Sequence, residues 1–161
     1  MNILGIDPGY AIIGFGAINY TKNKFNTLGY GSITTPAGLM IQNRLSIIYD
    51  ELNLIISKYK PDCLAIEKLY FSSNQKTVIT VAQARGVILL VGARNNLPIF
   101  EYTPLQIKQS VVGYGRATKA QVISMTASIL KLVSAPKLDD TADALAVAIC
   151  HAHSSVSLYN I

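Results

Sequence analysis

Two acidic side chains stand where a strand would place a carboxylate at the edge of a sheet. Asp7 ends the apolar segment NILGID and precedes the turn Pro8-Gly9, and Glu67 ends the apolar run CLAIE of residues 63–67. If these strands are parallel neighbours, they lie about 4.8 Å apart, so both carboxylates could reach one metal ion. An ionisable group at such a position favours a functional role over a structural one.

A second acidic pair stands near the end of the chain. Asp140 and Asp143 are three residues apart at the expected start of a helix, so they share one face of it. The positive end of the helix dipole favours negative charge there. Asp139 or Asp140 could instead serve only as a helix cap. Small side chains that follow would let this helix lie close to the sheet: Ala142, Ala144, Ala146 and Ala148.

Four carboxylates gathered in one pocket repel one another and raise their own pKa values unless a cation is present. Hard divalent ions with oxygen ligands meet that need, and Mg²⁺ is the natural candidate. Two such ions about 4 Å apart can activate water and stabilise the leaving oxygen of a phosphodiester. The acids therefore predict hydrolysis with two Mg²⁺ ions and no separate protein nucleophile.

The charge balance points to a polyanionic partner. The chain has 14 Lys and Arg against 9 Asp and Glu, a net charge of +5, and metal binding by the four acids would leave a more strongly cationic surface. Such a surface suits nucleic acid, because phosphate contacts release counterions. Many basic proteins bind no nucleic acid, so charge alone does not decide the matter.

The length and composition predict one cytoplasmic domain spanning residues 1–161. Half of the residues are apolar and the mean hydropathy is +0.34, which favours a surface buried against a second copy. The most apolar stretch, residues 86–93, is too short for the roughly 20 residues of a membrane span, and the first residues do not resemble a signal peptide. Cys63 and Cys150 lie in apolar segments without metal-type spacing and are expected to be reduced core residues.

Periodicity predicts an α/β fold with a five-stranded mixed sheet flanked by helices. The first three strands are joined by short loops, which favours an antiparallel meander. The expected strands are residues 2–7, 14–20, 26–34, 63–67 and 99–102. The expected helices are residues 41–59, 75–95, a stretch from Pro104, residues 119–132, and a last helix from Asp139 or Asp140. This order is that of the RNase H-like fold, although other α/β folds come close.

Five separated motifs resemble the RuvC family of Holliday-junction resolvases. They are LGIDPGYAIIGFGAI, AIEKLYF, AQARGV, PLQIKQSVVGYGRATKAQV and DDTADALAVAICHAH, in this order over residues 3–153. The resemblance implies an RNase H-like fold and a homodimer. It also implies paired nicks in opposing strands of a four-way DNA junction during recombination and repair, with Mg²⁺ or Mn²⁺.

The resemblance also assigns residues. Asp7, Glu67, Asp140 and Asp143 match the family's acids, and spacing favours Asp140 over its neighbour Asp139 as the ligand. Tyr70 matches an aromatic that lies at the junction centre, where a ring can stack on an exposed base; packing in the core is the alternative.

Basic residues around a glycine-rich loop resemble the family's phosphate contacts, although any exposed loop can carry such charges. They are Lys108, Arg116 and Lys119, and Lys119 could take part in chemistry or only bind phosphate. Lys76 and Arg85 are weaker candidates, since Arg85 could pair within its own helix. His151 and His153 point about 200° apart on a helix, so we expect them not to share a metal ion.

Two symmetric nicks require two active centres, which a twofold homodimer supplies. The helix over residues 75–95 is the expected contact, unless it is fully buried in its own subunit. A branch-migration helicase is a further candidate partner.

Two other functions compete with junction cleavage. An actin-type ATPase or kinase also begins with strand-Asp-x-Gly, but it needs a second nucleotide-gripping half and a longer chain. A non-catalytic junction-binding module would be expected to lack one or more acids, and all four are present.

Overall fold

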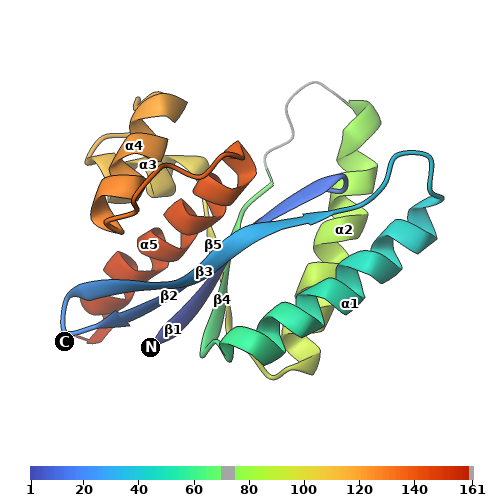
Figure 1. Ribbon diagram of the computed structural model, residues 1–161, viewed down its shortest axis with the longest axis horizontal. Coiled ribbons are helices and arrows are strands. Elements are labelled where there is room, and N and C mark those ends of the chain that lie inside the picture. Colours follow the sequence, from blue (N-terminus) through green and yellow to red (C-terminus); the bar gives the residue numbers. More distant parts are fainter. Residues whose placement is uncertain (70–74, 160–161) are drawn as a thin grey trace.

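A five-stranded sheet separates two layers of helices in the computed structural model, which describes residues 1–69 and 75–159 (Figure 1). The strands are β1 (Asn2–Asp7), β2 (Ile12–Thr21), β3 (Lys24–Thr34), β4 (Cys63–Glu67) and β5 (Ile99–Tyr102). The helices are α1 (Ile41–Tyr59), α2 (Gln75–Arg94), α3 (Pro104–Val112), α4 (Lys119–Ile129) and α5 (Asp139–Tyr159). Helices α1 and α2 cover one face of the sheet, and α3, α4 and α5 lie on the other.

The strand order is β3-β2-β1-β4-β5. The first three strands form the predicted antiparallel meander, while β4 runs parallel to both β1 and β5. The expected mixed sheet of five strands is thus confirmed, and the two strands that end in Asp7 and Glu67 are parallel neighbours, the condition on which their carboxylates could reach one metal ion.

Helix ends depend on residues in the left-handed conformation. Helix α1 ends before Lys60, which has a φ of 45° and donates its backbone N–H to the Ile56 carbonyl. Helix α4 ends at Ile129, three residues earlier than predicted. The reason is that Lys131 takes a φ of 52° and the Leu132 N–H donates to the Ala127 carbonyl, which closes the helix as a C-terminal cap.

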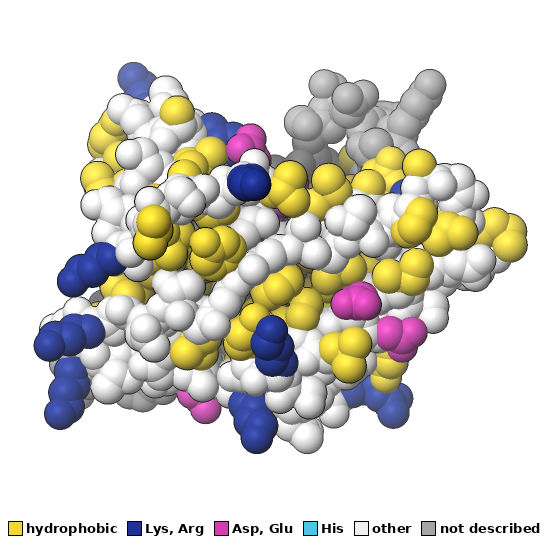
Figure 2. Space-filling model, in the orientation of Figure 1, with side chains coloured by type: hydrophobic (Ala, Val, Ile, Leu, Met, Phe, Trp, Pro, Cys, Tyr) yellow, Lys and Arg dark blue, Asp and Glu magenta, His cyan; other side chains and the backbone are white. Residues whose placement is uncertain are grey.

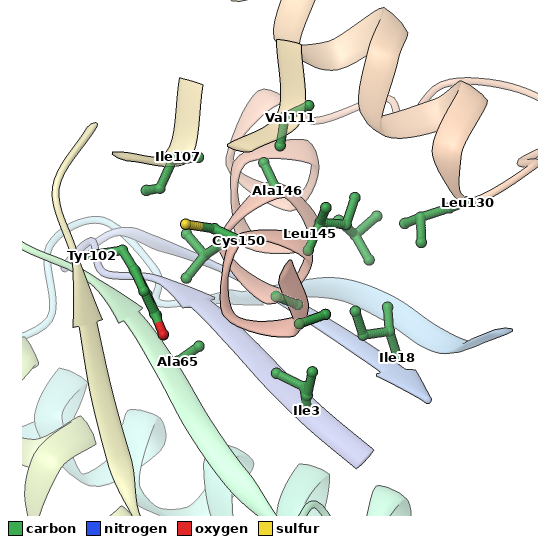
Figure 3. Packing of buried hydrophobic residues seen from close by; sticks show 14 of the residues in the cluster. Ile3, Ile18, Ala65, Tyr102, Ile107, Val111, Leu130, Leu145, Ala146 and Cys150 are labelled. Atoms are coloured by element: carbon green, nitrogen blue, oxygen red, sulfur yellow. The ribbon is translucent and has the colours of Figure 1, made fainter. Parts of the chain in front are cut away.

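The core on the α5 side of the sheet is formed mainly by aliphatic and small side chains. Leu145 and Cys150 of α5 belong to one buried cluster with Ile3 and Ile18 of the strands and Ile107 of α3 (Figure 3). Both cysteines are buried and free, as expected. Across the described ranges, no helix is long and apolar enough to cross a membrane.

Helix α5 approaches the sheet closely because glycines face it. A Cβ on Gly5 of β1 would overlap the backbone carbonyl of Ala144 in α5. The small-residue helix was therefore correctly expected to lie close to the sheet, and the matching small residues on the strands complete the contact.

Strand β3 forms one edge of the sheet and contains a bulge. Ala17 of β2 pairs with Gly29 and Ile18 pairs with Thr27, so Leu28 has no partner residue on β2. An extra residue of this kind bends the strand and increases its twist.

Candidate active site

Asp7 and Glu67 come together because β1 and β4 end at the same edge of the sheet. Ile6 pairs with Ile66, and each acid is the next residue of its strand. Two residues earlier, Gly5 faces α5 and its register partner Ala65 lies in the core on that side. Since side chains alternate along a strand, both carboxylates also face α5.

Asp140 reaches this edge through a glycine. Gly14 of β2 is the register partner of Asp7, and a Cβ on Gly14 would overlap the backbone carbonyl of Asp140. The adjacent Thr141 Oγ1 donates a hydrogen bond of 3.2 Å to the Gly31 carbonyl, which fixes the start of α5 on the sheet. Sequence reasoning missed Gly14, although a glycine inside a strand is a signal of close backbone approach.

The electrostatics place Glu67, Asp143 and Asp140 within range of Asp7. Burial, followed by the charges of Glu67, Asp143 and Asp140, raises the pKa of Asp7 from 3.8 to about 8. Burial and then the charge of Asp143 raise the pKa of Glu67 from 4.5 to about 7. Burial likewise raises the pKa of Asp143, against the lowering effect of Lys119. Without a cation, this edge of the sheet disfavours four negative charges.

A cleft of about 220 Å³ opens beside the acids. Glu67 and Asp143 line it together with Lys108 and Lys119. The remaining wall is apolar and comes from Pro104, Ile107 and Val122. The cleft thus combines acids from the sheet and α5 with cations from α3 and α4.

Lys119 lies directly against two of the acids on α5. Its Nζ is 3.0 Å from Asp143 Oδ2 and 3.4 Å from Asp139 Oδ2. Asp139, which the sequence left open as a metal ligand, thus contacts a lysine here.

Two capping boxes set the first residues of α3 and α4, the helices that carry Lys108 and Lys119. Thr103 accepts a hydrogen bond from the Gln106 N–H, and the Gln106 side chain accepts one from the Thr103 N–H; Thr118 and Gln121 repeat the arrangement. The second box makes Lys119 the first residue of α4. The repeated pattern T-x-x-Q was an available signal for both helix starts.

The other candidate residues lie away from the cleft or outside the described ranges. Arg116 is exposed and does not line the cleft. Tyr70 lies outside the described residues, as does the side chain of Lys76. Arg85 pairs with Glu101 of β5, so the expectation that it could pair within its own helix is corrected.

The two histidines have separate structural partners. The His151 Nδ1 is hydrogen-bonded to the buried Tyr102 hydroxyl at 2.7 Å, and burial lowers the pKa of His151. The His153 Nδ1 lies 3.0 Å from Ser110 Oγ, and its ring meets Phe25 edge-on. Each histidine thus has a hydrogen-bond partner of its own.

The donor types fit a hard divalent cation. The four acids offer only oxygen ligands, and a cation would relieve the repulsion that raises their pKa values. In this conformation, the described residues contain no group of three or more acidic, histidine or cysteine side chains already arranged around one ion. Asp143, one of these acids, contacts Lys119 through its Oδ2.

The sheet order, with an antiparallel meander followed by two parallel strands, places the chain in the RNase H-like class. Within that class, a model of the family described as crossover junction endodeoxyribonuclease RuvC matches residues 3–151. The chain belongs to the RuvC family. This membership replaces the alternative of an actin-type ATPase.

Individual relatives agree over nearly the full chain. Crossover junction endodeoxyribonuclease RuvC of Alkaliphilus oremlandii is 58% identical over 96% of this chain and 94% of the relative. The protein of the same name from Clostridioides difficile is 57% identical over 96% of this chain and 92% of the relative. The structure of Thermus thermophilus RuvC with a Holliday junction substrate superimposes with a TM-score of 0.91 at 29% identity, covering 96% of this chain and 94% of that one.

Proposed function

We propose that this chain is an endonuclease that resolves four-way DNA (Holliday) junctions by paired nicks, in recombination and repair. The observation that carries the proposal is the gathering of Asp7, Glu67, Asp140 and Asp143 beside a cleft lined by two lysines. It is supported by membership of a family whose relatives are named as crossover junction endodeoxyribonucleases.

The four acids are the proposed ligands of two Mg²⁺ ions, with Mn²⁺ as a substitute. When bound, such ions supply an activated water and stabilise the oxygen that leaves the phosphodiester. Asp7 and Glu67 stand on strands paired in the centre of the sheet, which holds their backbones rigidly. Asp140 and Asp143 stand on the first turns of α5, whose position Gly14 sets.

The basic residues are proposed to bind the DNA backbone. Lys108 and Lys119 line the cleft together with Glu67 and Asp143, so a phosphate placed there would meet two cations beside the acids. Arg116, on the exposed loop before α4, is proposed to contact a phosphate outside the cleft. Lys and Arg side chains are visible along the flank that carries α4 and the β2–β3 turn (Figure 2). Tyr70 keeps its predicted role of stacking on a base at the junction centre.

The working unit is proposed to be a homodimer that contacts through α2. Ile79 and Leu90 of α2 are 68% and 51% exposed. Eleven residues are close to three helical turns, so the two side chains lie on one stripe of the helix. Exposed apolar residues aligned in this way favour burial against a second copy. The cytoplasm is the proposed compartment, and a branch-migration helicase is a proposed further partner.

Replacing both Ile79 and Leu90 by Glu should convert a dimer into a monomer, because charges would then have to be buried without partners. Sedimentation equilibrium would measure the mass. Val133→Glu is the matched control, since Val133 is a fully exposed apolar residue outside α2. A double variant that stays dimeric would exclude this stripe as the contact.

Metal-dependent incision of a four-way junction beside a linear duplex of the same sequence tests the function. We expect cutting of the junction with Mg²⁺, a preference over the duplex of about 100-fold or more at equal salt, and no cutting in EDTA. Equal incision of both substrates would contradict junction selectivity. Junction binding without incision in either Mg²⁺ or Mn²⁺ would instead identify a non-catalytic binding module.

A further inference from the structure

Lys119 occupies a position between an acid of the cleft and an acid outside it. Asp143 lines the cleft and its side chain is 26% exposed, whereas Asp139 does not line the cleft and its side chain is 62% exposed. The two acids are four residues apart on α5, so they share one face of the helix. The Lys119 ammonium contacts both, at 3.0 and 3.4 Å.

An ammonium group and a divalent cation compete for the same carboxylate. The closer contact of Lys119 is with Oδ2 of Asp143, one of the proposed metal ligands. A metal ion bound there would place two like charges within a few ångströms of each other, a costly arrangement in a partly buried cleft. Metal binding would therefore weaken the contact of Lys119 with Asp143, and Asp139 is already within reach to keep the ammonium.

We propose that Lys119 is an internal cation that competes with the divalent metal for Asp143, and that Asp139 retains Lys119 once the metal is bound. The inference rests on the proposed metal site. It gives Asp139 the role of a positioning residue that acts through Lys119, and not that of a metal ligand. A DNA phosphate in the cleft offers Lys119 another partner, so substrate binding would also free Asp143 for the metal.

Mn²⁺ binding to the full chain without DNA, measured by electron paramagnetic resonance of the free ion, tests the competition. Lys119→Met should bind Mn²⁺ about three- to fivefold more tightly than the wild type, the range expected for release of a half-exposed ion pair. Lys108→Met is the matched control, because it removes a positive charge from the same cleft and Lys108 makes none of the ion pairs found among the described residues. Lys119→Gln provides a second variant, and circular dichroism checks that each is folded.

The variant Asp139→Asn tests whether Asp139 acts by holding Lys119 or only through its own negative charge. We expect it to weaken Mn²⁺ binding in the wild type, because Lys119 then rests on Asp143 alone, and to have little effect in the Lys119→Met background. An equal weakening in both backgrounds would show that Asp139 acts only by its charge or as a ligand, and would overturn its assigned role.

Two further outcomes are decisive. If Lys119→Met and Lys108→Met tighten Mn²⁺ binding equally, general charge explains the effect and the competition is overturned. If neither the wild type nor any variant binds Mn²⁺, the proposed metal site fails, and this inference fails with it. Mn²⁺ binding that follows the expected pattern in a protein that does not cut junctions would refute the proposed function while supporting the inference.

Discussion

Asp7→Asn should lower junction cleavage by more than about 100-fold and at the same time raise the melting temperature of the metal-free protein. Loss of groups that merely support metal ligands costs ten- to hundredfold, so loss of a ligand should cost more. The gain in stability has a separate cause: burial and three neighbouring acids disfavour the charged form of Asp7, and Asn removes that charge while keeping the shape.

The stability gain should depend on pH in a defined direction. The pKa of Asp7 is about 8 in the folded protein and near 3.8 in the unfolded chain. At a pH between these two pKa values, the folded state keeps a proton on Asp7 that the unfolded chain has released. The free energy of unfolding of the wild type therefore falls as the pH rises from about 4 through 8. The gain in melting temperature from Asp7→Asn should therefore be small near pH 4 and largest above pH 8. Each kcal/mol of added stability should raise the melting temperature by about 2–4 °C.

Thermal unfolding in EDTA across this pH range would measure the effect. Asp50→Asn removes the same charge from an exposed position on α1 and should change the melting temperature little at any pH. Mg²⁺ should stabilise the wild type at pH 8 much more than it stabilises Asp7→Asn. An Asp7→Asn protein that cuts at the wild-type rate would refute the ligand assignment.

Gly14→Ala should cause the second large loss. A single added methyl group at Gly14 meets the Asp140 carbonyl and also lies within 3.0 Å of the Thr141 backbone nitrogen, so the start of α5 must move. A displacement of about 1 Å in a catalytic group can cost on the order of 100-fold in rate. Overpacking of this kind also costs about 1–3 kcal/mol in stability.

The comparison with Gly31→Ala shows whether site geometry or general packing is responsible. A Cβ on Gly31 would lie 3.1 Å from the Phe15 ring, a contact that a small side-chain shift relieves. We expect Gly31→Ala to retain most of its single-turnover cleavage rate. Comparable cleavage by folded Gly14→Ala and Gly31→Ala, with folding checked by circular dichroism at the assay temperature, would show that Gly14 does not position Asp140.

Periodicity and strand-end acids were sufficient to predict the sheet. The apolar runs that end in Asp7 and Glu67 have the length and pattern of central strands, although their parallel pairing was known only from the structure. The small residues of the last helix, which begins at Asp139, likewise indicated close packing on the sheet. These features are local in sequence, so the sequence alone could reveal them.

Features that depend on tertiary contacts were not predictable in the same way. Arg85 pairs with Glu101 because α2 packs across β5, a contact between distant segments. The early end of α4 depends on the left-handed Lys131, a conformation that lysine seldom favours. Lys119 lies between Asp139 and Asp143 because the tertiary fold brings the start of α4 next to the start of α5. No local sequence pattern encodes that placement.

The unpaired Leu28 in β3 bears on how copies of this chain associate. An open edge strand of 11 residues offers backbone N–H and C=O groups that another chain could pair with, a route to aggregation. The bulge interrupts the regular spacing of those groups partway along the strand, and Lys24 adds charge at one end. Sheet-to-sheet extension is thereby discouraged, so this edge is less open to the repeated strand pairing that builds open-ended polymers.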